Sequence, residues 1–136
     1  MEVGIDTRLL SGIEMTLKIK TVSIMAMSMF YVGAGVQHFI NPLLLVQIVP
    51  PYLPYPLQLV YISGVCEIIL GLILLIPDLR FVAGWGLVLL LIAVFPANIY
   101  VAQTNGEAMN ISPLVAWGRL PFQLVLISIA YWHAQN

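Results

Sequence analysis

Four apolar stretches, each about as long as a lipid bilayer is thick, constrain the fold of this chain more than any other feature. They cover approximately residues 21–41, 57–76, 81–101 and 113–133. A helix needs about 20 residues to cross the hydrocarbon layer, and its backbone polar groups must bond within the segment because lipid offers them no partners. The sequence therefore predicts an all-α membrane protein, in which four transmembrane helices form one compact bundle over residues 21–133.

The composition excludes several other classes of protein. Hydrophobic residues make up 61% of the chain, charged residues make up 8%, and the formal net charge is -1, which is far from the composition of a soluble domain. No run of basic residues offers a surface to nucleic acid. The single cysteine, Cys66, excludes an internal disulfide and a cysteine-based metal site. We therefore expect the lipid bilayer as a partner, and neither nucleic acid nor a metal.

Residues 1–20 are expected to form a cytoplasmic or interfacial segment ahead of the first span. Ile5, Leu9, Ile13 and Leu17 repeat every four residues with charged residues between them, a pattern typical of an amphipathic helix that lies on the membrane surface. The same pattern is equally consistent with a cytoplasmic extension of the first transmembrane helix.

The basic residues predict the orientation of the chain. The segment 42–56 carries no charge, whereas four of the five basic residues precede the first span or follow the second: Arg8, Lys18, Lys20 and Arg80. Arg119 is the exception, at or just inside the outer end of the fourth span. Because loops rich in Lys and Arg stay in the cytoplasm, we expect both termini to be cytoplasmic, in a multi-pass protein of the cytoplasmic (inner) membrane. The proline-rich "VPPYLPYP" at 49–56 cannot be regular helix, and it is expected to cap the outer end.

One carboxylate, Glu67, stands inside the apolar stretch "SGVCEIILGLILLIP" at 63–77. Inserting a carboxylate near the centre of a transmembrane helix costs roughly 2.5 to 3.5 kcal/mol of free energy. Each Leu or Ile favours insertion by only about 0.3 to 0.6 kcal/mol. Gly64 and Gly71 share its helix face, and small residues allow helices to approach closely. We therefore predict that Glu67 faces the bundle interior and that Gly35, Gly64 and Gly71 mediate helix packing.

Six polar residues within the spans form the predicted ligand-binding or buried polar cluster. The helical rise of about 1.5 Å per residue divides them into an outer layer of His38, Asn98 and Arg119 and a central layer of Glu67, Tyr31 and Gln123. Arg119 and Gln123 are four residues apart on one helix face and can link the layers. Whether Arg119 reaches Glu67 is left open by the span boundaries. Tyr31 and Gln123 are also typical of polar contacts between helices.

Structural explanations stand beside a binding role for these residues. Glu67 can be a structural carboxylate, either protonated or paired with Arg119. His38, near the end of its span, is typical of a hydrogen bond at a helix end. Asn98 can bond a carbonyl that Pro96 leaves without a partner.

Two stretches resemble a known family. "FYVGAGVQHFINP" at 30–42 and "CEIILGLILLIPDLRFVAGWG" at 66–86 are similar to the pattern of the DoxX and DoxX-like membrane proteins, and the resemblance extends over about residues 25–132. It implies a compact four-helix membrane protein. Members of that family include a small subunit associated with thiosulfate:quinone oxidation and proteins that assist the maturation of redox proteins. The residues that fall on the pattern are Gly35, His38, Pro42, Glu67, Gly71 and Arg80, although most members have a basic residue in place of His38.

Three functions are consistent with these features. We favour a small lipophilic-ligand (quinone-like) binding or accessory subunit of a membrane redox system, with a quinone or lipid whose polar end bonds Glu67 together with His38 or Arg119. The second is a non-catalytic structural or assembly partner, in a complex with another membrane protein or as a homo-oligomer. The third is a proton-coupled transporter that uses Glu67. Without a nucleophile–base pair, a self-sufficient enzyme is not expected.

Overall fold

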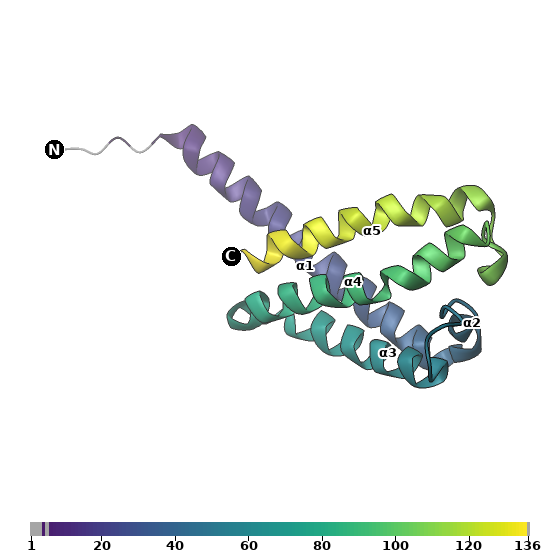
Figure 1. Ribbon diagram of the computed structural model, residues 1–136. Helices are drawn as coiled ribbons and strands as arrows, with labels where there is room; N and C mark the ends of the chain where they lie inside the picture. Colours follow the sequence, from purple (N-terminus) through teal and green to yellow (C-terminus); the bar gives the residue numbers. More distant parts are fainter. Residues whose placement is uncertain (1–3, 5, 136) are drawn as a thin grey trace.

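Helices account for almost the whole chain in this computed structural model, which describes residues 4 and 6–135. The described residues are 83% helical and include no strand. Four helices are long and apolar enough to cross a membrane: α1 (Thr7–Ile40), α3 (Pro56–Ile73), α4 (Arg80–Gln103) and α5 (Pro113–Ala134) (Figure 1). The predicted all-α membrane protein with four transmembrane helices is confirmed.

Short elements join the long helices. The five-residue helix α2 (Pro42–Val46) follows α1, and it was not predicted because one turn and a half is too short for a periodic pattern. The proline-rich segment after it is non-helical, as predicted, and it ends at Tyr55, whose φ of 55° is left-handed. Two 3-10 turns, η1 (Pro77–Leu79) and η2 (Glu107–Met109), connect α3 to α4 and α4 to α5.

The first helix is much longer than a membrane crossing requires. Its 34 residues span about 51 Å at the usual rise per residue, against a hydrocarbon layer of about 30 Å. Asp6 caps it by accepting the backbone N–H of Arg8 at 2.9 Å, and the helix continues to Ile40, so its first turns project beyond the bundle (Figure 1). The segment before the first span is therefore an extension of α1 and not a separate surface helix. Ile5, part of the predicted repeat, lies outside the described residues.

The four long helices form two pairs. α1 packs mainly against α3, and α4 packs mainly against α5. The pairs close on each other at the C-terminal end of the bundle, where Leu74, Leu87 and Ala130 are fully buried in one apolar core. At the same end, Ser23 Oγ of α1 lies 2.9 Å from His133 Nε2 of α5.

The opposite end of the bundle is closed by a second apolar cluster. This end, called the α2 end below, is where Ile48 packs with Val101 and Ala116. Ile48 lies between α2 and the proline-rich segment, and the other two residues belong to α4 and α5. The bundle is therefore filled at both ends, and the space for a site lies between the two clusters.

Glycines bring α1 and α3 into backbone contact. A Cβ atom on Gly35 would lie 2.6 Å from the carbonyl oxygen of Gly64, and one on Gly71 would lie 3.2 Å from that of Ser28. The structure therefore places Gly35, Gly64 and Gly71 at this contact. Side chains that flank these glycines are forced to meet at short range.

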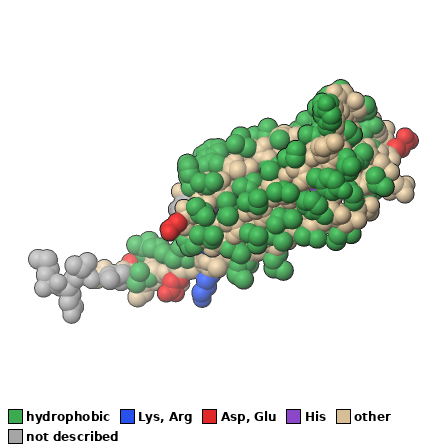
Figure 2. Space-filling view, turned by 90° about the horizontal axis from the view of Figure 1, so that it is seen from below, with side chains coloured by type: hydrophobic (Ala, Val, Ile, Leu, Met, Phe, Trp, Pro, Cys, Tyr) green, Lys and Arg blue, Asp and Glu red, His purple; other side chains and the backbone are tan. Residues whose placement is uncertain are grey.

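The surface agrees with a membrane environment. Figure 2 shows apolar side chains over the body of the bundle, while acidic and basic side chains lie toward its ends. The exposed apolar side chains include Leu89 on α4 and Leu124 on α5, in the middle of their helices, where lipid would surround them. This distribution is that of a multi-pass membrane protein.

Candidate functional site

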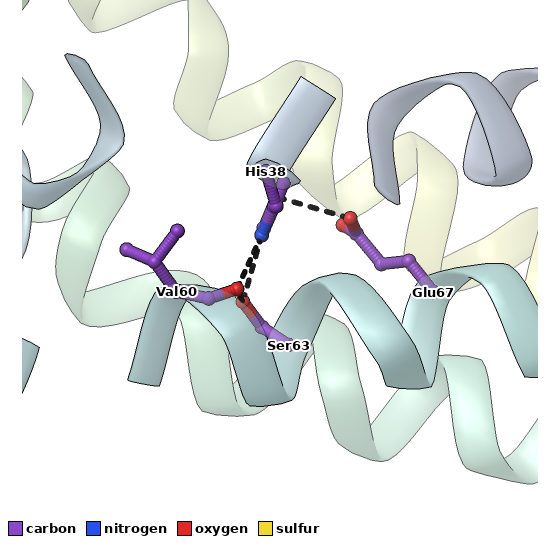
Figure 3. A network of polar contacts seen from close by, with 4 residues as sticks. All are labelled: His38, Val60, Ser63 and Glu67. Carbon is purple, nitrogen blue, oxygen red and sulfur yellow. Dashed lines mark hydrogen bonds and ion pairs between the residues drawn. The ribbon is translucent and has the colours of Figure 1, made fainter. Parts of the chain in front are cut away.

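Glu67 and His38 form an ion pair between α1 and α3. His38 Nε2 lies 3.1 Å from Glu67 Oε2, and the two side chains are only 15% and 13% exposed. Figure 3 shows them facing each other across the gap between the two helices. The ring N–H is not aligned with Oε2, which has no hydrogen-bond partner among the described residues. The carboxylate is therefore near a counter-charge but retains an unused oxygen.

This pair corrects the predicted division into two depth layers. His38 was assigned to the outer layer and Glu67 to the central one, several ångströms apart along the bundle. In a helix, each side chain leans toward the N-terminus of its own helix. Since α1 and α3 run in opposite directions, His38 and Glu67 lean toward each other and close the gap. Backbone rise alone does not include this tilt of the side chains.

The other nitrogen of His38 determines where a proton sits in the pair. Nδ1 lies 2.8 Å from the carbonyl oxygen of Val60 and 3.0 Å from Ser63 Oγ, which itself donates to the same carbonyl at 2.9 Å. A carbonyl only accepts, so Nδ1 carries a hydrogen. Nε2 lies 3.1 Å from Oε2, and a neutral imidazole there would leave the buried carboxylate without a counter-charge, which is strongly unfavourable, so the pair holds one proton. His38 and Glu67 together hold one proton and no net charge.

A second polar group joins α4 to α5. Arg119 Nε donates to Asn98 Oδ1 at 3.1 Å, Asn98 Nδ2 donates to Gln123 Oε1, and Gln123 Nε2 donates to the carbonyl oxygen of Leu91. Gln123, and not Asn98, thus bonds a carbonyl of α4, the helix that contains Pro96, which corrects the structural explanation given for Asn98. Asn98 instead bridges Arg119 and Gln123.

Arg119 does not reach Glu67. Besides Asn98, its guanidinium contacts the sulfur of Met109, which lies 3.0 Å from Nη1. Within the part of the chain that the structure describes, the one ion pair between side chains is that of His38 and Glu67. The question that the span boundaries left open is therefore resolved: the carboxylate is paired within its own helix pair, and Arg119 has only neutral partners.

One cavity of about 800 Å³ lies between the two helix pairs. Its walls are mostly apolar and come from all four long helices and from the segment after α2. All six residues of the predicted cluster line it: Tyr31, His38, Glu67, Asn98, Arg119 and Gln123. A volume of this size is within the range of small-molecule sites, about 300 to 1,000 Å³.

Two polar atoms of the cavity lining are buried without a partner. Glu67 Oε2 and Tyr31 Oη have no hydrogen bond within the described residues, and Tyr31 is only 1% exposed. A buried polar group without a partner costs about 1 to 3 kcal/mol. The cavity lining therefore includes two polar atoms that the described residues leave without a hydrogen bond.

Sequence reasoning missed several residues that line the cavity or make buried contacts. Ser63 and Cys66 line the cavity beside Glu67, and Met109 contacts Arg119. His133 was given no role, yet it is fully buried and contacts Ser23. A serine one helical turn before Glu67 was a usable signal, whereas the Met109 and Ser23 contacts join distant segments and leave no local pattern. Nowhere in residues 4 and 6–135 do three His, Cys, Asp or Glu side chains gather as a metal site.

Comparison with known proteins adds one match. A family model described as a domain of unknown function (DUF8561) matches residues 27–134. The matched range contains the later part of α1, the other three membrane-spanning helices and all six polar residues of the cavity. No curated protein and no solved structure matches the chain.

Proposed function

This chain belongs to the family described as a domain of unknown function (DUF8561), and we propose that it binds a small lipophilic molecule inside the membrane. The ligand is quinone-like in having an apolar body and a polar end. The protein acts as an accessory subunit that offers this site to a membrane redox partner, and it is not a self-sufficient enzyme.

The cavity and its two unpartnered polar atoms carry this proposal. A mostly apolar pocket with a few convergent polar groups is the usual form of a small-molecule site. Tyr31 Oη can donate a hydrogen bond to a ligand oxygen, and Glu67 Oε2 can accept one from a ligand hydroxyl. The apolar lining residues, such as Leu91 and Leu126, would surround the ligand body.

A quinone is the first ligand class to test. The carbonyl oxygens of a quinone ring accept hydrogen bonds, and the ring hydroxyls of its reduced form donate them. Tyr31 and Glu67 match both forms. The resemblance to DoxX-like proteins, some of which are associated with quinone chemistry, gives additional support and stays a prediction.

Replacing Tyr31 by phenylalanine should weaken binding of a short-chain ubiquinone. The loss of one hydrogen bond costs about 1 kcal/mol, which is roughly a fivefold rise in Kd. The measurement is a ligand titration of the purified protein in detergent. Tyr61→Phe is the matched control, because Tyr61 stacks on Phe39 and does not line the cavity. Equal Kd values for the two variants would rule out Tyr31 as a ligand contact.

We also propose that the C-terminal end of the bundle faces the cytoplasm, with both termini, in a cytoplasmic (inner) membrane. Lys20 lies 5.6 Å from the ring centre of Trp132 near the end of α5, and Arg80 donates to the carbonyl oxygen of Leu74 at 3.0 Å. Both basic residues therefore belong to one end. Basic residues at one end favour a cytoplasmic location for that end.

Cysteine labelling tests this orientation. In a Cys66→Ser background, an impermeant thiol reagent applied to intact cells should label Leu53→Cys and Asn105→Cys, which lie at the α2 end. It should label Glu14→Cys only after the cells are opened. Labelling of Glu14→Cys in intact cells, with protection at the other two positions, would reverse the proposed orientation.

A further inference from the structure

The cavity contains a positive charge that the protein itself does not balance. We infer that the ligand carries an oxyanion group, a carboxylate or a phosphate on a single apolar chain, and that Arg119 binds it. This inference rests on the proposed function and specifies the chemical class of the ligand.

The charge balance of the cavity lining indicates the sign of the charge on the ligand. Of the charged residue types, only Glu67 and Arg119 line the cavity. Glu67 shares one proton with His38, so that pair is neutral as a unit. The guanidinium of Arg119 stays protonated in proteins. The lining therefore carries one net positive charge in surroundings of low dielectric constant, where an anion is attracted strongly.

The contacts of Arg119 hold its guanidinium in place without neutralising it. Nε and Nη1 are used by Asn98 Oδ1 and Met109 Sδ. Nη2 has no hydrogen-bond partner among the residues that the structure describes. Asn98 is held in turn by Gln123, which is only 2% exposed. A guanidinium that is fixed by neutral groups and retains unused N–H donors is well suited to bind an oxyanion.

The cavity walls away from Arg119 limit the polarity and the size of the ligand outside its oxyanion group. The walls are mostly apolar, and about 800 Å³ accommodates one molecule of drug size. Two of the lining residues, Phe30 on α1 and Phe122 on α5, are about half exposed, at 48% and 54%. Side chains of the cavity lining thus also form part of the lipid-facing surface, from which a membrane-dissolved amphiphile would enter.

Dodecyl probes of different charge test the inference. Purified protein in a nonionic detergent is titrated at neutral pH with dodecanoate, dodecyl phosphate, methyl dodecanoate and decylubiquinone, and ligand binding is followed by the shift in Tm and by competition. We expect at least one of the two oxyanions to bind about tenfold or more tightly than the neutral ester. Preference for dodecanoate would indicate a fatty acid, and preference for dodecyl phosphate a phosphate-bearing lipid.

Substitutions at Arg119 connect this preference to one residue. In Arg119→Gln, the ratio of oxyanion to ester affinity should fall close to one, while Arg119→Lys should keep most of it. Lys20→Gln is the control, because it removes a positive charge outside the cavity and should leave the ratio unchanged. The Tm of each variant without ligand reports whether the fold is kept.

The outcomes separate this inference from the proposed function. Binding of decylubiquinone or the ester as tightly as both oxyanions, with sensitivity to Tyr31→Phe, would overturn the oxyanion inference and keep the proposed function. Binding of none of the four probes would overturn both. An oxyanion preference that survives in Arg119→Gln would also overturn the inference, since Arg119 would not be its source.

Discussion

Replacing Gly35 by alanine is expected to destabilise the bundle severely, although it adds a single methyl group. The new Cβ atom would lie 2.6 Å from the carbonyl oxygen of Gly64 and 2.6 Å from Ile68 Cγ1. A backbone oxygen cannot rotate away, so α1 and α3 must separate. Overpacking typically costs about 1 to 3 kcal/mol, and separating these helices also breaks the pair of His38 and Glu67. We expect a large fall in Tm in detergent.

Gly33→Ala is the matched control for this prediction. Gly33 lies on the same helix two residues earlier, and a Cβ atom there would meet nothing within 4 Å. Because alanine favours helix over glycine by up to about 1 kcal/mol, Gly33→Ala should leave Tm unchanged or raise it. Equal Tm values for the two variants would show that α1 and α3 are not in backbone contact.

Removing one member of the ion pair should cost more than removing both. In His38→Leu, Glu67 loses its only counter-charge within the bundle, and breaking a buried pair typically costs about 3 to 5 kcal/mol. The double variant with leucine at positions 38 and 67 leaves neither member of the pair without its partner and should recover much of that loss. The free energy of unfolding in a mixed-detergent titration gives the comparison.

Glu67→Gln tests the shared proton in the same experiment. The amide can donate to Nε2 of a neutral His38, while Nδ1 continues to donate to the Val60 carbonyl. We therefore expect a stability within about 1 kcal/mol of the wild type. A large loss that is restored by a second change, Arg119→Gln, would show instead that the carboxylate balances Arg119, contrary to the observed contacts. Glu14→Gln, on the projecting part of α1, is the control.

The spans and the inward face of Glu67 could be predicted because they depend on local rules. Lipid forces each crossing segment to satisfy its own backbone, so the length of an apolar run gives a helix directly. The glycines at positions 64 and 71 share the face of Glu67, and that arrangement indicated a helix contact there. The polar residues of the candidate site could also be predicted, because burying a polar side chain in an apolar segment is costly and such residues are rare there.

The partners of these residues could not be predicted, since they depend on how helices approach and tilt. The pairing of His38 with Glu67 requires the antiparallel lean of two side chains from different helices. The contact between Arg119 and Met109 requires the turn η2 to fold back over α5. The cavity volume depends on the separation of the two helix pairs, which no single segment specifies.

The two helix pairs have a consequence for how the protein is made. Both members of the ion pair, His38 and Glu67, lie in α1 and α3, and Arg119 with its partners Asn98 and Met109 lies between the start of α4 and the end of α5. Chains are synthesised from the N-terminus, and early units fold first. The first half can therefore enter the membrane as a hairpin whose carboxylate already has its counter-charge, before α5 leaves the ribosome. Each hairpin thus forms its own polar contacts during insertion, and the ligand cavity arises only when the two hairpins dock.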